Sequence, residues 1–297
     1  MARVAIIVTC FNDGETLGET VTSIRAGAPD VELVIVDDGS SDERTLQVLS
    51  QFQAEGVRVI HQENRGPGAA AMAGIEVTAA PYVMRFDADD LLEPGAVDAL
   101  ADALDTAREA AAAWGDLQTF GLTDFRIPSP PTLDPWLITY TNCLPGPGAL
   151  IRREALVAAG GWQLRNGFED WDLWMRLAER GNAGTYVPSV IFRYRRDQGG
   201  RFMETAAPHA DRYYEDLRAR HEQLFSARGE SRQRSSASAL LKLSVTAVEA
   251  TPGLSRLTRI QLCEFLARLS FGSVRLVVPM VAQAIGLRVR RRSNGPS

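Results

Sequence analysis

The chain has 297 residues, of which 45% are hydrophobic and 23% are charged, and its formal net charge is −5. This size and composition suit one large globular domain, or one domain with an appended segment. The acidic balance lacks the signature of a nucleic-acid-binding protein, so we expect no nucleic-acid partner.

The cysteines and apolar runs indicate the cellular compartment. Cys10, Cys143 and Cys263 are odd in number and far apart, which suits a reducing compartment better than a disulfide framework or a metal site. The N-terminus enters a strand pattern at once, so we expect no signal peptide. No apolar run reaches the roughly 20 residues that span a bilayer. We therefore expect a cytoplasmic protein, which could also lie at the inner face of the membrane.

Strand and helix patterns alternate through the first part of the chain. Apolar runs typical of buried strands occupy residues 4–9 and 31–36, a third strand pattern occupies residues 57–60, and a fourth run ends at Asp87. Helical patterns separate these runs. The alternation predicts an α/β fold with a Rossmann-like, mostly parallel sheet flanked by helices. Ligands of such sheets bind beyond the carboxyl ends of the strands, and each strand here ends in polar residues.

The pattern is less regular in the middle of the chain and helical towards its end. We expect helices at residues 153–159 and 168–177, a strand at 186–194, helices at 211–225, 237–248 and 254–284, and a linker at 231–238. We therefore divide the chain into a domain at residues 1–204 and a helical C-terminal extension at 205–297. The extension could be a lid, a dimer element or a membrane-surface element.

The loops that follow the first three strands each have a ligand-binding and a structural interpretation. After the first strand, a polar turn could hold a nucleobase or ribose, with Asp13 accepting from hydroxyls, or Asn12 or Asp13 could cap a helix. After the second strand, Asp38 could accept from a base N–H, or the segment could form an Asx turn and a cap. After the third, Arg65 beside glycines at a helix start suits an anion, with an ordinary glycine turn as the alternative.

Two groups of carboxylates suggest a metal site and a general base. Asp87 and Asp89 end a buried strand, where a hard divalent cation could supply the counter-charge and bridge two phosphates of a nucleotide. Glu169 and Asp170 precede Trp171, and a carboxylate near apolar, aromatic surface can act as a general base. The alternative for the second group is a helix N-terminus, where the dipole stabilises acids. We expect Glu169 and Asp172 to be partly structural.

Taken together and in this order, the motifs resemble those of the inverting family 2 glycosyltransferases, which have the GT-A fold. The resemblance covers about residues 4–197, and its specificity comes from the joint occurrence of the motifs. It implies a metal-dependent enzyme that moves a hexosyl group from a nucleoside diphosphate sugar, here expected to be a UDP-sugar, to an acceptor hydroxyl. An α-linked donor would then give a β-linked product.

The resemblance also implies roles for individual residues. Thr9, Phe11 and Asp13 would line the nucleoside pocket, with Asp38 at the base, Arg65 near the base or phosphates, and Asp87 and Ala88 at the ribose and metal side. Asp89 would ligate Mn²⁺ or Mg²⁺, together with Asp87 and Asp197. Asp170 would deprotonate the acceptor. Gly148, Ala149, Glu169 and Trp171 would border the donor sugar or the acceptor, which we expect to be a saccharide, a lipid-linked compound or a small molecule.

The sequence departs from the family pattern at several positions. Met72 and Ala73 stand where family members often carry Arg-Asn, and Asp197 stands where many carry a histidine. Aspartate can also ligate a hard cation, and Arg195 or Arg196 could instead hold the diphosphate. The departures leave a catalytically inactive sugar-binding or scaffold protein as one alternative. A nucleotidyltransferase is another, but it would need a glycine-rich, lysine-containing loop near the first strand.

The end of the chain has its own charge pattern. Residues 254–297 contain eight arginines and one acid, so this segment is about +7 and the remainder about −12. Apolar residues mixed with these arginines suggest peripheral contact with an anionic membrane surface, near a lipid-linked acceptor. The alternative is a helical lid or homodimer element with a solvated basic end.

Overall fold

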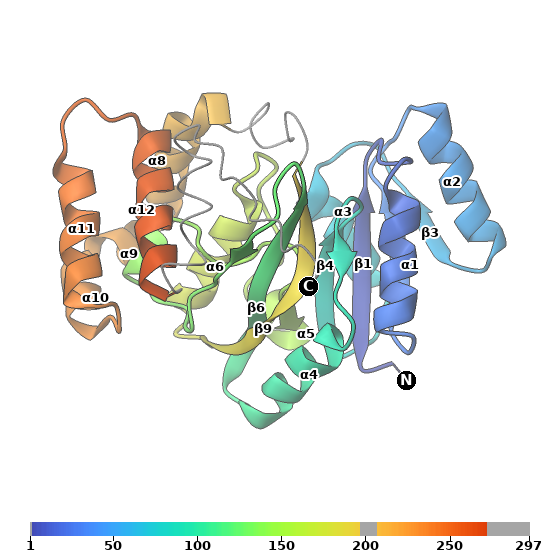
Figure 1. The fold of residues 1–297 in the computed structure, drawn as a ribbon, viewed down its shortest axis with the longest axis horizontal. Coiled ribbons are helices and arrows are strands. Elements are labelled where there is room, and N and C mark those ends of the chain that lie inside the picture. The colour runs from blue at the N-terminus through green and yellow to red at the C-terminus, as the bar shows by residue number, and fades with distance from the viewer. Residues whose placement is uncertain (1, 197–206, 272–297) are drawn as a thin grey trace, which may run out of the picture.

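A single mixed sheet runs through the computed structural model, which describes residues 2–196 and 207–271. The strands are β1 (Val4–Cys10), β2 (Glu32–Asp37), β3 (Arg58–His61), β4 (Tyr82–Asp87), β5 (Leu91–Leu92), β6 (Ala110–Gly121), β7 (Arg126–Ile127), β8 (Leu150–Arg152) and β9 (Ala183–Arg196). Their order is β3-β2-β1-β4-β8-β6-β9-β5, and β7 pairs with β6. Figure 1 shows helices on both sides of this sheet. The α/β class predicted from the sequence is confirmed.

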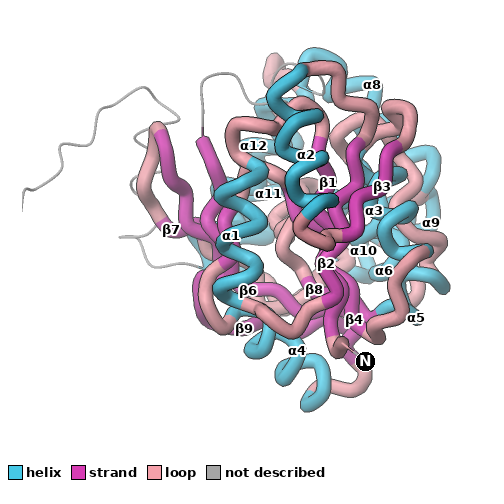
Figure 2. The backbone as a smooth tube through the Cα atoms, turned by 90° about the vertical axis from the view of Figure 1, so that its right-hand side faces the viewer, coloured by secondary structure: helices cyan, strands magenta, loops and turns pink. Residues whose placement is uncertain are grey.

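The N-terminal half of the sheet is parallel. β1 pairs in parallel with β2 and β4, and β2 with β3. All of β1 is buried because its alternate side chains enter two apolar clusters: Ile6 lies in the cluster of α1, α2 and α4, and Ile7 in that of α3. Figure 2 shows α1 and α3 on opposite sides of β1. These helices are α1 (Leu17–Gly27), α2 (Glu43–Ala54), α3 (Pro67–Glu76) and α4 (Ala96–Thr106). The first three strands lie within one residue of their predicted ends.

The second half of the sheet mixes strand directions around β6. β8 is antiparallel to both β4 and β6, whereas β9 is parallel to β6. The sequence did not predict β6, because its four leading alanines have high helix propensity. In the fold these small residues lie between two strands, and Trp114 packs edge-to-face on Trp174 with 5.7 Å between ring centroids. Tertiary packing therefore overrides the local preference.

The helical segments between β7 and β9 include a helix that begins with the predicted carboxylate pair, Glu169 and Asp170. They are η1 (Leu137–Thr139), α5 (Arg153–Ala158) and α6 (Glu169–Glu179). Both predicted helices in this region are confirmed, and the predicted strand at 186–194 is the central part of β9. Asp197 lies outside the described residues.

Helices make up the described part of the C-terminal extension. They are η2 (Ala207–His209), α8 (Ala210–Arg220), α9 (Glu222–Ser226), α10 (Arg228–Arg234), α11 (Ala239–Ala250) and α12 (Arg256–Phe271). Figure 1 shows α8, α11 and α12 at the end of the molecule opposite α2 and β3. Tyr214 on α8 packs against Trp171 on α6, so the extension shares an apolar cluster with the sheet. None of the described helices is long and apolar enough to cross a membrane.

The structure corrects the predicted linker of the extension and does not describe the predicted domain boundary. The linker predicted at 231–238 is partly wrong, because α10 continues to Arg234 and only the following residues, up to the α11 cap at Ser238, are irregular. The domain boundary predicted near residue 205 falls in the undescribed stretch 197–206. The division into two domains therefore stays a prediction.

Candidate active site

Parallel pairing brings the loops after β1, β2 and β4 to one edge of the sheet. Thr9 lies beside Asp87 in the β1–β4 register, and the Thr9 hydroxyl donates to Asp87 Oδ1 at 3.4 Å. Asn12 joins the first two loops: it has a positive φ of 59°, and its Oδ1 accepts from Ser41 N at 2.8 Å. The predicted donor-side residues therefore lie along a common edge.

Hydrogen bonds within these loops support the structural interpretation of their polar residues. Asp13 Oδ2 accepts from Phe11 N at 2.9 Å, which fixes the turn after β1. Asp38 is buried, and its carboxylate accepts from the backbone N–H groups of Arg65 and Gly66, both at 2.8 Å. Asp38 thus holds the glycine-rich turn in place, while the Arg65 residue itself is exposed. Any contact of Asp38 with a base would be additional to these bonds and stays a prediction.

In α3, which follows the glycine-rich turn, the two residues that depart from the family pattern, Met72 and Ala73, make packing contacts. Met72 lies against the backbone of Gly161, where an added Cβ would be 2.5 Å from its sulfur atom. Ala73 is half-buried and packs against the apolar cluster of α3. Both positions therefore serve packing in this chain.

An acidic corner follows β4. Carboxylate oxygens of Asp87, Asp89 and Asp90 lie within 4.8 Å of one another. Asp90 is fully buried, one of its oxygens accepts from Arg195 N at 3.0 Å, and the other has no protein partner. Burial, with the charges of Asp89 and Asp87, raises the pKa of Asp90 well above its usual range. Three converging oxygen donors suit a hard divalent cation.

The backbone of this corner is tied to two other elements. The Ala88 carbonyl accepts from the Thr20 hydroxyl on α1 at 2.9 Å. The Asp89 carbonyl accepts from Arg195 Nε on β9 at 2.9 Å, and Arg195 also pairs with Glu19. Arg195 is therefore committed to contacts with α1 and the acidic corner.

Arg85, on β4, joins the acidic corner to the predicted base. Its guanidinium is buried and lies 3.5 Å from Asp87 Oδ1, 3.2 Å from Glu169 Oε1 and 3.0 Å from Asp170 Oδ2. Burial lowers the pKa of Arg85, but the attraction of Asp170, Asp87 and Glu169 outweighs it and raises that pKa overall. Arg85 is therefore charged at any physiological pH.

Asp170 is held at both carboxylate oxygens. Oδ1 accepts from Trp162 Nε1 at 2.7 Å, and Oδ2 meets Arg85. Gly146 closes over the same carboxylate, since an added Cβ there would lie 2.1 Å from Oδ2. Burial raises the pKa of Asp170, whereas Arg85 lowers it, and burial prevails. Burial and the neighbouring Asp170 likewise raise the pKa of Glu169.

Of the residues predicted at the sugar or acceptor side, Gly148 and Ala149 lie next to β4. Gly148 N donates to the Arg85 carbonyl at 3.0 Å, and its positive φ of 78° together with the close Phe192 ring excludes a side chain there. Ala149 is buried and directly precedes β8. Trp171 is only 2% exposed, and its indole N–H donates to the Ile138 carbonyl at 2.6 Å. In this structure Trp171 is thus part of the core and does not present an open ring face.

Three residues of the site were not assigned a role from the sequence: Arg85, Asp90 and Trp162. A usable signal exists for the first, because Arg85 is the one charged residue inside the otherwise apolar run from Tyr82 to Phe86. Such a residue needs a buried partner. The partners of Arg85 on α6 are 84 and 85 residues away in sequence, so the sequence pattern alone could not identify them.

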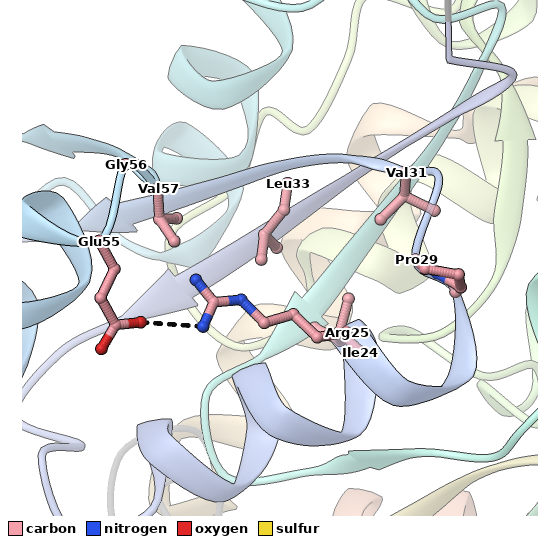
Figure 3. A pocket seen from close by; sticks show the side chains of 9 residues that line it. Ile24, Arg25, Pro29, Val31, Leu33, Glu55, Gly56 and Val57 are labelled. Atoms are coloured by element: carbon pink, nitrogen blue, oxygen red, sulfur yellow. Dashed lines mark hydrogen bonds and ion pairs between the residues drawn. The ribbon is translucent and has the colours of Figure 1, made fainter.

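A hollow lies away from this edge. It has a volume of about 280 Å³, lies between the end of α1 and the starts of β2 and β3, and is crossed by an ion pair between Arg25 and Glu55 of 2.9 Å (Figure 3). Val31 and Val57, which precede two parallel strands, form part of its lining. The hollow is therefore at the amino ends of the strands, opposite the acidic corner.

Comparisons with known proteins identify the family to which the chain is similar. The profile of the family described as "Glycosyl transferase family 2" matches residues 5–157, about half of the chain. The glycosyltransferase GlyG of Streptococcus pneumoniae is 34% identical over 101 residues, which are 33% of this chain and 33% of GlyG. The match thus spans about a third of the length of that relative.

Two solved structures share the fold over nearly the whole chain. Staphylococcus aureus TarS (residues 1–349) in complex with UDP-GlcNAc has a TM-score of 0.58 at 15% identity, and the match covers 98% of this chain and 93% of that one. The mannosyltransferase PcManGT from Pyrobaculum calidifontis, in complex with GDP-Man and Mn²⁺, has a TM-score of 0.52 at 17% identity, covering 97% and 76%. The predicted GT-A fold is confirmed.

Proposed function

Because the chain belongs to glycosyl transferase family 2 and is a glycosyltransferase, we propose that it transfers a sugar from a nucleoside diphosphate sugar to an acceptor hydroxyl with inversion at the anomeric carbon. The observation that carries this proposal is the proximity of two groups far apart in sequence. One nitrogen of Arg85 lies 3.5 Å from Asp87 Oδ1 and 3.0 Å from Asp170 Oδ2. A phosphate-side corner and a proton acceptor are therefore neighbours.

The acidic corner would hold a divalent cation, Mn²⁺ or Mg²⁺, through Asp87 and Asp89. Asp90 is a poorer ligand, because it is fully buried and already accepts from the backbone of Arg195. When bound, the cation would neutralise charge on the diphosphate as it leaves. Asp197, predicted as a further ligand, lies outside the described residues. We retain it as a candidate ligand on the basis of the sequence alone.

Asp170 would accept the proton of the acceptor hydroxyl as its oxygen attacks the anomeric carbon. The new C–O bond would form opposite the breaking bond to the nucleoside diphosphate, so an α-linked donor gives a β-linked product. Trp162 and Arg85 hold the Asp170 carboxylate from two sides, which keeps its orientation fixed during the attack. Burial favours the protonated form that Asp170 would reach.

The donor pocket would be formed by Thr9, Phe11, Asp13, Asp38 and Arg65, with Ala88 beside the metal corner. A UDP-sugar is our first candidate donor, supported by the complexes of TarS with UDP-GlcNAc and with UDP. PcManGT, in complex with GDP-Man and Mn²⁺, makes GDP-sugars the second group to test. Candidate acceptors are saccharides, lipid-linked compounds and small molecules.

Replacement of Asp170 tests the proposal. A thermal-shift screen of UDP- and GDP-sugars with Mn²⁺ would first identify the donor. Asp170→Asn should then leave donor affinity within about threefold of wild type and lower the transfer rate on the order of 10²-fold or more, because a general base is lost. Calorimetric titration and radiolabelled transfer measure the two quantities. Near-normal turnover of the variant would move the base elsewhere, to Glu169 first.

The same screen addresses the alternative functions. A folded chain that binds a nucleotide sugar but neither transfers nor hydrolyses it would indicate a sugar-binding or scaffold protein. A nucleotidyltransferase would release pyrophosphate from a nucleoside triphosphate. The turn between β1 and α1 contains one glycine, Gly14, and no lysine, which argues against that third activity.

A further inference from the structure

Arg85 is the only charged side chain of β4 that is fully enclosed, and the proposed reaction leaves its role open. Its side chain is 4% exposed, while that of Asp87 on the same strand is 33% exposed. A buried guanidinium without partners would be strongly destabilising, so at least one carboxylate beside it is needed for folding. Three carboxylates are, however, more than the neutralisation of one positive charge requires.

The charges around Arg85 do not balance. One guanidinium faces Asp87, Glu169 and Asp170, and two of these carboxylates are adjacent in sequence on the first turn of α6. A single ion pair would have neutralised Arg85. The extra acids instead place Asp170 next to Asp87. The guanidinium of Arg85, which faces both carboxylates, must offset their mutual repulsion.

The planar fork of Arg85 determines the direction of each carboxylate. Nη1 donates to Glu169 at 3.2 Å, and Nη2 donates to Asp170 at 3.0 Å while also facing Asp87. The backbone of Arg85 is held in β4, where its carbonyl accepts from Gly148 N at 3.0 Å. A lysine could supply the charge, but its ammonium cannot form this planar set of contacts.

We propose that Arg85 is a positioning residue of the transfer reaction, which holds the Asp170 carboxylate at a set place relative to the Asp87 corner and is itself anchored by Glu169. The inference rests on the proposed function, in which Asp170 is the base. Arg85 acts through Asp170 and Asp87. It follows that the effect of changing Arg85 depends on whether residue 170 can act as a base.

A double-mutant cycle with Arg85→Lys and Asp170→Asn tests this dependence. Arg85→Lys should lower kcat about tenfold or more and change the KM of the donor by less than about threefold. In the Asp170→Asn background the same substitution should lower kcat by less than about threefold, because no base remains to be positioned. The donor is whichever of UDP-GlcNAc, UDP-glucose, UDP-galactose and GDP-mannose the wild type uses with Mn²⁺.

A matched control and a second variant keep the test independent of folding. Arg153→Lys is the control, because Arg153 donates to the carbonyls of Ala80 and Ile75 near the other end of β4. This variant should be less stable than wild type but should have the same kcat. Glu169→Gln removes the anchor of Nη1 and keeps the Asp170 contact. It should lower kcat several-fold with unchanged affinity for UDP and Mn²⁺ by calorimetry, and should add nothing to Asp170→Asn.

The outcomes separate the inference from the function on which it rests. Equal effects of Arg85→Lys in both backgrounds, or a kcat like that of wild type, would overturn the positioning role while Asp170→Asn still confirms the base. If Arg85→Lys does not fold, a wild-type kcat for Glu169→Gln would overturn it instead. A wild type that transfers no sugar from any of the four donors would overturn the proposed function and this inference together.

Discussion

At the scale of single residues, the acidic corner combines one enclosed and two more accessible carboxylates. Asp90 is fully buried and bonded to β9, whereas Asp87 and Asp89 are half-buried. This difference assigns them separate tasks: Asp90 fixes the turn, and the other two can meet a cation. A hard cation between carboxylates loses much of its affinity when one ligand is removed.

Asp89→Ala should therefore abolish the Mn²⁺-dependent part of donor binding. The variant should bind UDP equally well with and without Mn²⁺, whereas the wild type should bind it at least tenfold more tightly with the ion. Calorimetric titration of UDP at fixed Mn²⁺ measures this. Asp30→Ala, at an exposed turn far from the corner, is the control, and unchanged Mn²⁺ dependence in Asp89→Ala would refute the metal role.

At the scale of elements, α6 is fixed by three acids of its first turn. Glu169 and Asp170 meet Arg85, and the next acid, Asp172, is fully buried among two arginines and a histidine. Arg176 Nη2 lies 2.7 Å from Asp172 Oδ2, while Arg220 Nε and His221 Nε2 lie 2.8 Å and 3.2 Å from Oδ1. Asp172 thus joins α6 to the C-terminal helices, as its expected structural role required.

This cluster makes stability depend on pH. Burial raises the pKa of Asp172, but hydrogen bonds from His221 and Arg220 and the charge of Arg176 lower it to about 2, below its ordinary value of 3.8. Its contribution of about 2 kcal/mol is therefore complete above pH 4 and is lost as the pH falls towards 2. Asp172→Asn should be less stable than wild type by about 2 kcal/mol or more at pH 7, and the difference should shrink at pH 3.

Urea unfolding at the two pH values measures the effect. Asp216→Asn, at an exposed position on α8, removes a carboxylate from the same region and should change stability by less than about 0.5 kcal/mol at either pH. A stability difference for Asp172→Asn that stays constant between pH 7 and pH 3 would show that the cluster does not depend on the ionised carboxylate.

The elements also show which parts of the fold the sequence can predict. Strands β1 and β2 were found because their apolar runs are continuous and largely buried. Strand β3, at the edge of the sheet, is exposed or half-buried and was found from its β-branched residues. Strand β6 was missed because its alanines are favourable in a helix and only the packing of Trp114 and Trp174 decides the outcome. The same limit applies to the site: Asp87 and Asp170 follow local motifs, whereas the Arg85 fork that joins them depends on tertiary contact.

At the scale of the whole molecule, the excess positive charge of the C-terminus is divided into two parts. In the described part, Arg256 pairs with Glu249 at 3.1 Å, and Arg268 pairs with Glu264 at 2.9 Å and donates to the Pro128 carbonyl. These arginines stabilise the packing of α12 and are not available to an external partner. Arg259, also on α12, donates to the Thr251 carbonyl at 2.6 Å. The other five arginines of the segment lie outside the described residues: Arg275, Arg288, Arg290, Arg291 and Arg292.

If the extension binds an anionic membrane surface, the last four of these arginines must supply most of the attraction. At about 1 kcal/mol for each basic residue, changing Arg288, Arg290, Arg291 and Arg292 to glutamine should weaken binding to phosphatidylserine vesicles at least a hundredfold in a flotation assay. The matched control changes four exposed arginines of the described part, Arg44, Arg108, Arg212 and Arg232, and should float like wild type. A lid or dimer role predicts instead that none of the three proteins floats, because the attraction would act within or between copies of the chain.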